Sequence, residues 1–323
     1  MAKISFVIPC YRSESTIRKV VDEIRDTVNA HNGAVSNSAV SSSTVDDYEI
    51  ILVNDCSPDG VWNEIKTLAA EDPNIKGICL AKNFGQHSAL MAGYANATGD
   101  YIVSLDDDGQ TPACETYKLV EKLEEGFDVV YGYYNHAAQH LFRRLGSWTN
   151  KKMAEAIIGQ PKTLNTTSFF IMRKFIAEEI VRYPHPFPYI SGLVFRATKN
   201  LGNVYVGHRK RLEGKSGYTL SGLISLWVNG FTAFSVKPLR AATFIGIICA
   251  LVGFVAGLFV VYEKFMNPQV PIGYTSLLAT LLFVGGMIML LLGLIGEYVG
   301  RIYISINQSP QYVVRERTQP REG

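Results

Sequence analysis

Two long stretches of the chain contain no charged side chain, and they constrain the fold more than any other feature of the sequence. No Asp, Glu, Lys or Arg occurs between Arg240 and Glu263, or between Lys264 and Glu297. Each stretch supplies the roughly 20 apolar residues that an α-helix needs to cross the hydrocarbon core of a bilayer. The sequence therefore predicts a C-terminal two-helix transmembrane hairpin, with spans at about residues 241–262 and 274–296, and excludes an ordinary soluble enzyme.

The charges around this hairpin predict its orientation. Basic residues lie on both sides of it: Lys237, Arg240, Arg301, Arg315 and Arg317. The connecting loop carries one cation, Lys264, beside Glu263. Positive charge favours the cytoplasmic side of a membrane. We therefore expect a multi-pass membrane protein whose two termini, with everything that precedes the hairpin, are cytoplasmic.

Two pairs of glycines occur at a spacing of four in the hairpin, Gly253 and Gly257 inside the first span, and Gly296 and Gly300 at the end of the second. Small residues at this spacing let helices approach each other closely. They can serve a contact inside the hairpin or a contact with a second copy of the chain, and the sequence does not choose between the hairpin and a homo-oligomer.

In the first two-fifths of the chain, short apolar runs alternate with segments in which apolar residues recur at helical spacing. Short apolar runs predict strands at 4–8, 48–53, 77–80, 101–105 and 128–131, and helical spacing predicts helices near 17–28, 86–97 and 115–125. The serine-rich segment 30–45 has no charge and no period, so we expect a loop there. Strands that alternate with helices indicate an α/β fold with a mainly parallel, doubly wound sheet.

Polar segments follow four of these strands. They are Pro9–Glu14, Asn54–Asp59, Lys82–His87 and Asp106–Pro112. In open α/β sheets, ligands bind beyond the carboxyl ends of the strands, so these segments are the candidate site. Tyr11 offers a ring for stacking, and Asp55 is placed to accept hydrogen bonds from a base or a ribose.

Three adjacent carboxylates, Asp106, Asp107 and Asp108, form the strongest chemical signal. Like charges at the end of an apolar strand repel one another, and a divalent cation removes that cost. On an extended segment Asp106 and Asp108 point the same way, and Gln110 adds a neutral oxygen. Oxygen ligands favour Mg²⁺ or Mn²⁺. Because the protein supplies so few of them, coordination positions on the metal remain for substrate phosphates. The alternative is a solvated acidic turn.

The net charge, the cysteines and the first apolar run argue against several other interpretations. The net charge of +2 gives no support for nucleic-acid binding. The five cysteines are odd in number and include no CxxC pair, which indicates reduced thiols and no zinc site. The first apolar run is short and contains Pro9, unlike a signal peptide.

The motifs VIPCYRSE, VNDCSPD, KNFGQHSALMAG and SLDDDGQTP resemble those of family 2 glycosyltransferases with the GT-A fold, a Rossmann-like catalytic domain. The resemblance is greatest to polyprenyl-phosphate glycosyltransferases, and it includes RLEGKSGY and the C-terminal run GLIGEYVGRIYISINQSPQYVV. It implies a catalytic domain at 1–218, and its bacterial members imply a place in the bacterial inner (plasma) membrane. The apolar and aromatic segment that follows predicts an interfacial helix at 219–237, with a core helix as the equal alternative. The hairpin then occupies 238–307, and a cytoplasmic tail 308–323.

The resemblance also implies roles for particular residues. The expected nucleotide-binding residues are Pro9, Tyr11, Glu14, Asp55, Asn83, Asp106 and Asp107. Asp106 and Asp108 would be the catalytic DxD pair, and with Gln110 they would hold the metal, Mg²⁺ or Mn²⁺. The expected acceptor-phosphate residues are Arg143, Arg211, Lys215, Ser216 and Tyr218.

Four departures from the family pattern stand out. Arg12 replaces the usual Asn, Cys56 replaces the usual Gly of a turn, and Asp107 fills a position that is often Ala. The segment Asn165–Phe170 stands where relatives carry an Asp and an Arg. This last change weakens any inference about the identity of the sugar.

The resemblance implies an inverting transfer of a sugar from a nucleotide diphosphate sugar, with uridine favoured, to polyprenyl phosphate. Two alternatives remain. A processive polysaccharide synthase of the same fold would usually carry a QxxRW motif and more spans, and neither is found in this sequence. A non-catalytic membrane protein that only senses a nucleotide sugar would not need the metal motif.

Overall fold

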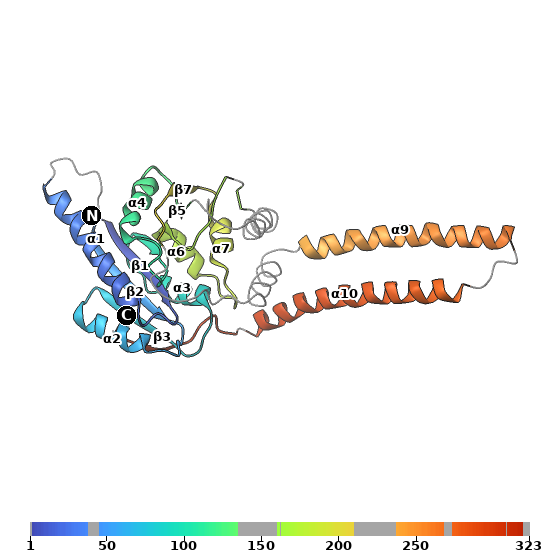
Figure 1. The fold of residues 1–323 in the computed structure, drawn as a ribbon, viewed down its shortest axis with the longest axis horizontal. Coiled ribbons are helices and arrows are strands. Elements are labelled where there is room, and N and C mark those ends of the chain that lie inside the picture. The colour runs from blue at the N-terminus through green and yellow to red at the C-terminus, as the bar shows by residue number, and fades with distance from the viewer. Residues whose placement is uncertain are drawn as a thin grey trace. The chain divides into compact units, whose positions relative to one another are not determined.

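The computed structural model describes residues 2–37, 45–134, 160–161, 163–209, 237–267, 273–307 and 309–318. The chain divides into two compact units (Figure 1). One consists of Met1–Gly217 together with Gln308–Gly323, and the other of Tyr218–Asn307.

The first unit is built on one eight-stranded sheet in the order β7-β5-β6-β4-β1-β2-β3-β8. Strands β1 to β4 run parallel, whereas β6 and β8 are antiparallel to their neighbours. The expected α/β class and mainly parallel sheet are therefore confirmed. The strands are β1 (Ala2–Cys10), β2 (Val45–Asn54), β3 (Ile75–Leu80), β4 (Tyr101–Ser104), β5 (Val129–Tyr133), β6 (Phe170–Arg173), β7 (Leu201–Tyr205) and β8 (Val314–Arg317).

Helices cover both faces of this sheet. One face carries α1 (Ile17–Asn37), α2 (Val61–Glu71), the short 3₁₀ helix Ala113–Glu115 and α4 (Thr116–Glu124). The other carries α3 (Gln86–Tyr94), α6 (Lys174–Val181) and α7 (Ile190–Ala197).

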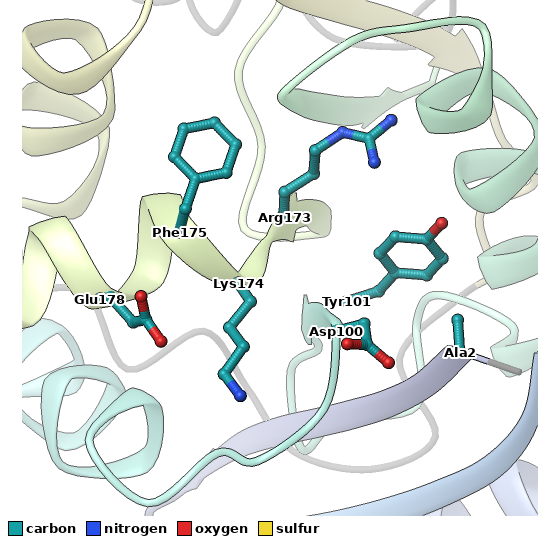
Figure 2. Close-up of a pocket in the computed structure, with 7 residues that line it drawn as sticks. All are labelled: Ala2, Asp100, Tyr101, Arg173, Lys174, Phe175 and Glu178. Atoms are coloured by element: carbon teal, nitrogen blue, oxygen red, sulfur yellow. The ribbon is translucent and has the colours of Figure 1, made fainter.

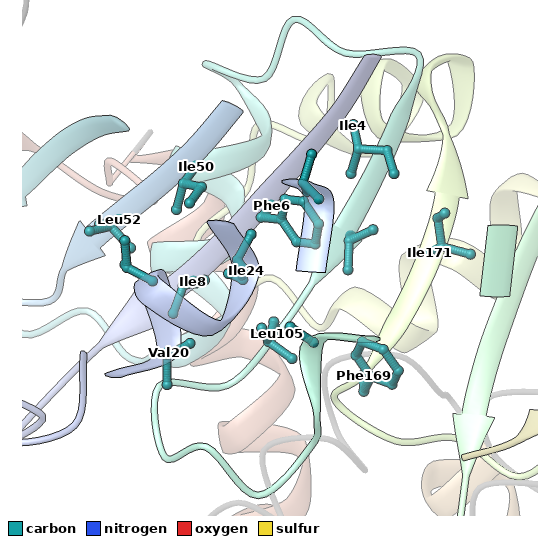
Figure 3. Packing of buried hydrophobic residues seen from close by; sticks show 14 of the residues in the cluster. Ile4, Phe6, Ile8, Val20, Ile24, Ile50, Leu52, Leu105, Phe169 and Ile171 are labelled. Atoms are coloured by element: carbon teal, nitrogen blue, oxygen red, sulfur yellow. The ribbon is translucent and has the colours of Figure 1, made fainter. Parts of the chain in front are cut away.

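The alternation of side chains along β1 explains both layers. Ile4, Phe6 and Ile8 are buried in one cluster with apolar residues of α1, among them Val20 and Ile24 (Figure 3). Val7 points to the opposite face, as the period of two in a strand requires. There Gly93 of α3 lies so close that an added Cβ would be 2.2 Å from Val7 Cγ1. The glycine therefore lets α3 approach the sheet.

Two local predictions were wrong. The segment predicted as a loop from residue 30 begins as helix, because α1 continues to Asn37. Extending an existing helix costs far less than starting one, so weak helix formers can continue it. The strand predicted at 4–8, which stops before Pro9, in fact runs to Cys10 and pairs with β2 there. Since β4 pairs with β1 only as far as Val7, Pro9 has one neighbouring strand, and its missing N–H is tolerated.

Strand β8 comes from the end of the chain and was not predicted. It pairs antiparallel with β3, with Ile78 opposite Arg317 and Cys79 opposite Glu316. The Trp62 indole donates a hydrogen bond to Glu316 (3.0 Å), and Gly77 N donates to Thr318 Oγ1 (2.8 Å). These contacts cover the edge of β3 that would otherwise be open.

The second unit contains the helices α9 (Lys237–Met266) and α10 (Tyr274–Ile306). Both are long and apolar enough to cross a membrane by length and composition, with windows at Ala242–Phe259 and Phe283–Ile304. The expected pair of spans thus falls within two helices. At Gly253, Gly257, Gly296 and Gly300 an added Cβ would meet nothing within 4 Å among the described residues.

Candidate functional site

The candidate site lies where the direction of chain progression through the sheet reverses. From β1 the chain adds β2 and β3 on one side, and then crosses to place β4 on the other side of β1. Such a switch point leaves a crevice at the carboxyl ends of the strands. We call the segments that follow β1, β2, β3 and β4 the polar rim: residues 11–14, 55–59, 81–86 and 106–110.

A hydrogen bond crosses this switch point. Tyr11 N, directly after β1, donates to Asp107 Oδ2 beyond β4 (3.0 Å). Thr16 Oγ1, just before α1, donates to the Asp107 carbonyl oxygen (2.7 Å). Burial raises the pKa of Asp107, although the hydrogen bond from Tyr11 N opposes this effect. The middle carboxylate of the acidic run therefore fastens the rim to β1.

Asp106 and Asp108 have different surroundings from Asp107. The Asp106 carboxylate accepts hydrogen bonds from Gln86 Nε2 (3.0 Å) and from the Ser168 hydroxyl. Asp108 Oδ1 accepts from Gln110 N (3.1 Å). The segment was expected to be extended, but it turns at Asp107 and Asp108. Both outer carboxylates are half-buried on the rim.

This donor set fits a hard divalent cation only in part. The described residues contain no group of three or more His, Cys, Asp or Glu side chains that could hold a metal ion. Asp106, Asp108 and the Gln110 side chain offer oxygen atoms alone, which suits Mg²⁺ or Mn²⁺ rather than zinc. An ion held here needs further oxygen ligands, and substrate phosphates are the usual source.

Asp55 holds another rim segment in place. Its two carboxylate oxygens accept hydrogen bonds from Phe84 N (2.7 Å) and Gly85 N (2.8 Å). The side chain is buried, and burial raises its pKa while the two N–H groups lower it. Asp55 was expected to contact a nucleoside, but its acceptors in the structure serve the loop that leads to Gln86.

The other expected nucleotide residues are spread along the rim. Tyr11 is 43% exposed, Asn83 is exposed, and Pro9 is buried. Glu14 is exposed, and its Oε2 accepts a hydrogen bond from Gly60 N (2.8 Å), which joins the β1 and β2 ends of the rim. The structure thus brings these residues to one edge, with Tyr11 and Asn83 open to solvent.

Two departures noted in the sequence coincide with left-handed backbone. Arg12 has a φ of 57° and Cys56 a φ of 51°. Asn and Gly, the residues that the resemblance leads us to expect at these positions, adopt this conformation more readily than Arg and Cys. These two turns of the rim therefore carry residues that adopt left-handed backbone less readily than Asn or Gly.

His87 follows the rim at the start of α3. Burial lowers its pKa to about 4, and its ring lies edge-on to Tyr189, 5.2 Å between centroids. An imidazole that is neutral and so weakly basic is a poor general base near pH 7.

Gln86 and Ser168 were not among the predicted site residues. Gln86 lies within a predicted helix, and Ser168 within the segment flagged as departing from the family, just before β6. Only the pairing of β6 with β4, which sets Phe170 opposite Ser104, brings Ser168 to Asp106. No local sequence pattern predicts such a contact between distant parts of the chain.

A separate hollow of about 670 Å³ lies near the amino ends of the parallel strands, opposite the ends that carry the polar rim (Figure 2). Ala2 and Tyr101, at the starts of β1 and β4, help to line it. Its Arg173 guanidinium already donates to the carbonyl oxygens of Phe127 and Leu123, both at 2.9 Å. The hollow is thus remote from the polar rim.

The residues predicted to bind the acceptor phosphate lie outside the described residues: Arg143, Arg211, Lys215, Ser216 and Tyr218. The predicted interfacial helix before Lys237 lies outside them as well.

Comparisons with known proteins agree with the fold. The chain matches the family model described as Glycosyl transferase family 2 over residues 5–181, and the model described as GtrB C-terminal hairpin over residues 237–302. The family match and the observed sheet confirm the expected GT-A fold.

Three relatives align along nearly the whole chain. The prophage bactoprenol glucosyl transferase homolog of Escherichia coli is 30% identical, covering 97% of this chain and 98% of the relative. The undecaprenyl-phosphate 4-deoxy-4-formamido-L-arabinose transferase of Yersinia pestis is 32% identical, with 97% and 93% covered. The uncharacterized glycosyltransferase YkcC of Bacillus subtilis is 30% identical, with 97% and 93% covered. With the family model matched over more than half of its length, the chain belongs to glycosyl transferase family 2.

Proposed function

We propose that this chain transfers a sugar from a nucleoside diphosphate sugar, with a UDP-sugar favoured, to polyprenyl (undecaprenyl) phosphate. The product would be a polyprenyl-phosphate-sugar donor for modification of cell-envelope glycans. The observation that carries the proposal is the Asp106–Asp108 turn at the switch point, in a chain that also has two helices of membrane-spanning length. The names of two relatives, a bactoprenol glucosyl transferase homolog and an undecaprenyl-phosphate sugar transferase, support a lipid phosphate as acceptor.

Asp106, Asp108 and Gln110 are the proposed metal ligands. A bound Mg²⁺ or Mn²⁺ supplies neutralisation of the charge that develops on the departing diphosphate. Gln86 and Ser168 hold the Asp106 carboxylate in a fixed orientation. Asp107 was expected to contact the nucleotide, but its hydrogen bond to Tyr11 N favours a role in holding the rim.

The acceptor needs no strong general base. A phosphate monoester has its second pKa near ~6 and is largely ionised at neutral pH. The protein must therefore align the two substrates and stabilise the leaving group. A single in-line displacement inverts the anomeric centre. Arg143, Arg211, Lys215, Ser216 and Tyr218 remain the predicted acceptor-phosphate residues.

The membrane hairpin gives this reaction its location. A polyprenyl chain stays in the bilayer, so its phosphate must be met at the membrane surface. Strand β8 pairs with β3, so the chain before α9 and the chain after α10 belong to one folded unit. Both segments must then lie on the same side of the membrane. This supports two crossings, with a catalytic domain at 1–218, an interfacial helix at 219–237 and both termini in the cytoplasm.

The test is turnover by the purified full chain in lipid or detergent. The reaction would contain polyprenyl phosphate, Mg²⁺ or Mn²⁺, and a panel of UDP-, GDP- and dTDP-sugars, with the glycolipid product separated by chromatography. We expect one polyprenyl-phosphate monosaccharide from one donor, and loss of product with EDTA. A growing polymer would support the processive synthase instead. Nucleotide-sugar binding without any transfer would support the sensor.

A further inference from the structure

The polar rim is rich in carboxylates, yet its proposed ligand is an anion. Glu14, Asp55 and Asp59 lie on it in addition to the three aspartates beyond β4. A diphosphate that approaches such a surface is repelled unless cations offset these charges. Positively charged side chains on the rim should therefore strengthen binding of the donor.

Two exposed cations of the rim, Arg12 and Lys82, make no ion pair within the described parts of the chain. By contrast, Arg18, Arg25 and Arg209 are each paired with a carboxylate there. Lys82 lies beyond β3, two strands away from β1, with its Nζ 4.9 Å from the centre of the Phe84 ring. Arg12 lies beyond β1, the direct neighbour of β4 and its acidic turn.

The backbone on both sides of Arg12 is held in place. Tyr11 N donates to Asp107 Oδ2, and Arg12 N donates to Ser57 Oγ (2.7 Å). The Arg12 guanidinium carbon lies 5.5 Å from the centre of the Tyr11 ring, within the range of a cation–π contact. The guanidinium thus projects from a fixed point between the ends of β4 and β2.

The conformation of Arg12 is unfavourable for its own backbone. A φ of 57° is the left-handed region, in which a long side chain costs more than Asn or Gly. No described carboxylate or carbonyl oxygen accepts a hydrogen bond from the guanidinium, so among the described residues only the Tyr11 ring and the hydrogen bond from Arg12 N to Ser57 act against this cost. Strained residues of this kind are concentrated at ligand sites.

We propose that Arg12 is a further donor-binding residue, whose guanidinium contacts the diphosphate of the nucleotide sugar. The inference rests on the proposed function, because it assigns a ligand to the same site. A guanidinium offers two parallel N–H groups that match two phosphate oxygens, and the Tyr11 ring orders it before binding. The charge of Arg12 would add to that of the metal at the leaving group.

Nucleotide binding by the full chain in detergent tests this without requiring sugar transfer. Calorimetric titrations with UDP and with uridine, both in the presence of Mg²⁺, would compare the wild type with Arg12→Asn and Arg12→Lys. We expect the UDP dissociation constant to rise about 10- to 100-fold in Arg12→Asn, as for the loss of a charge-assisted hydrogen bond. Arg12→Lys should lie between, and uridine binding should not change.

Thermal unfolding separates this role from a structural one. Because Asn tolerates left-handed backbone, Arg12→Asn should raise the unfolding midpoint by about 2–4 °C while it weakens UDP binding. Phe187→Asn is the matched control, since Phe187 has a φ of 62° outside the rim and its replacement relieves the same kind of strain without removing a charge. It should raise the midpoint and leave UDP binding intact. Arg182→Asn, on a paired surface arginine, controls for net charge.

Three results would overturn the inference. One is an Arg12→Asn variant that binds UDP as tightly as the wild type. Another is an equal loss for UDP and uridine, which would assign Arg12 to the nucleoside. The third is an equal loss in Arg182→Asn, which would reduce the effect to net charge. A wild type that binds none of UDP, GDP and dTDP would instead overturn the proposed function itself.

Discussion

Tyr11 N donates a hydrogen bond to Asp107 Oδ2 across the switch point of the sheet, at 3.0 Å. The three adjacent aspartates therefore do not act as one group. Asp107 joins the acidic turn to the end of β1, whereas the Asp106 carboxylate accepts from Gln86 and Ser168, and that of Asp108 from Gln110 N. This division predicts that the three residues differ in their response to the same substitution.

Asp106→Asn and Asp108→Asn should each lower transfer by about 100-fold or more, because each removes a charge from the proposed metal site and its leaving-group stabilisation. Asp107→Asn is the matched control, since an amide oxygen can still accept from Tyr11 N. It should keep most of the activity. Glycolipid formation and circular dichroism of each variant would check this. Full activity in Asp108→Asn would contradict the metal assignment.

The sequence predicted the sheet and the rim because both depend on local patterns. The apolar runs that end at Ile8, Val53 and Leu80 mark strands, and polar residues follow directly. Strand β8 was missed because its residues, Val314–Arg317, are mostly charged and gain their strand conformation from β3. The contact of Ser168 with Asp106 likewise depends on which strand lies beside β4, and no local period encodes that.

The buried carboxylate of Glu49, on β2, predicts that the stability of the fold depends on pH. Glu49 is 1% exposed and accepts hydrogen bonds from Ser5 Oγ (2.6 Å) and Thr98 N (2.6 Å), with Lys76 Nζ at 2.9 Å. Burial acts to raise the pKa of Glu49, but these partners together lower it below its usual value. The ionised form therefore stabilises the fold above the pKa of an unfolded Glu, and this stability is lost as pH falls through the folded pKa.

Glu49→Gln should accordingly lower the free energy of unfolding by about 2–3 kcal/mol at pH 7, and by less near pH 4. Asp47→Asn, on an exposed residue of the same strand that pairs with Lys3, should cost less than about 1 kcal/mol. Denaturant unfolding followed by tryptophan fluorescence at both pH values would measure this. An equal loss at pH 7 and pH 4 would show that ionisation of Glu49 is irrelevant.

His87 predicts a different pH dependence. Burial lowers its folded pKa to about 4, below the unfolded value of 6.5. Between these values the unfolded chain binds more protons, so stability should rise with pH across this window and fall as the medium is acidified. The full effect of one such group is about 3 kcal/mol.

Substitution of His87 by Phe should remove this part of the pH slope, because Phe keeps a ring against Tyr189 but cannot bind a proton. His185→Gln, at an exposed histidine, should leave the slope unchanged. Transfer activity should survive in His87→Phe, since the proposed reaction needs no base at this position. A large loss of activity without a change in stability would reopen the case for His87 as a catalytic group.

The C-terminal strand should contribute measurably to the stability of the catalytic unit. Thr318 Oγ1 accepts a hydrogen bond from Gly77 N at 2.8 Å, and Val has almost the shape of Thr but no acceptor. Thr318→Val therefore leaves the N–H of Gly77 without this partner, which should cost about 1–2 kcal/mol.

Thr67→Val is the matched control for that prediction, because the Thr67 hydroxyl is exposed and bonds only within its own helix, to Asn63 O (3.0 Å). It should change the free energy of unfolding by no more than about 0.5 kcal/mol. Both variants can be compared by denaturant unfolding, with hydrogen exchange of β3 as a local readout. If Thr318→Val protects β3 from exchange as well as the wild type does, the strand covers the sheet edge without stabilising it. If β3 alone exchanges faster, the segment that contains β8 is an integral part of the catalytic sheet, because the hydrogen bond lost in the variant joins Thr318, directly after β8, to Gly77 of β3.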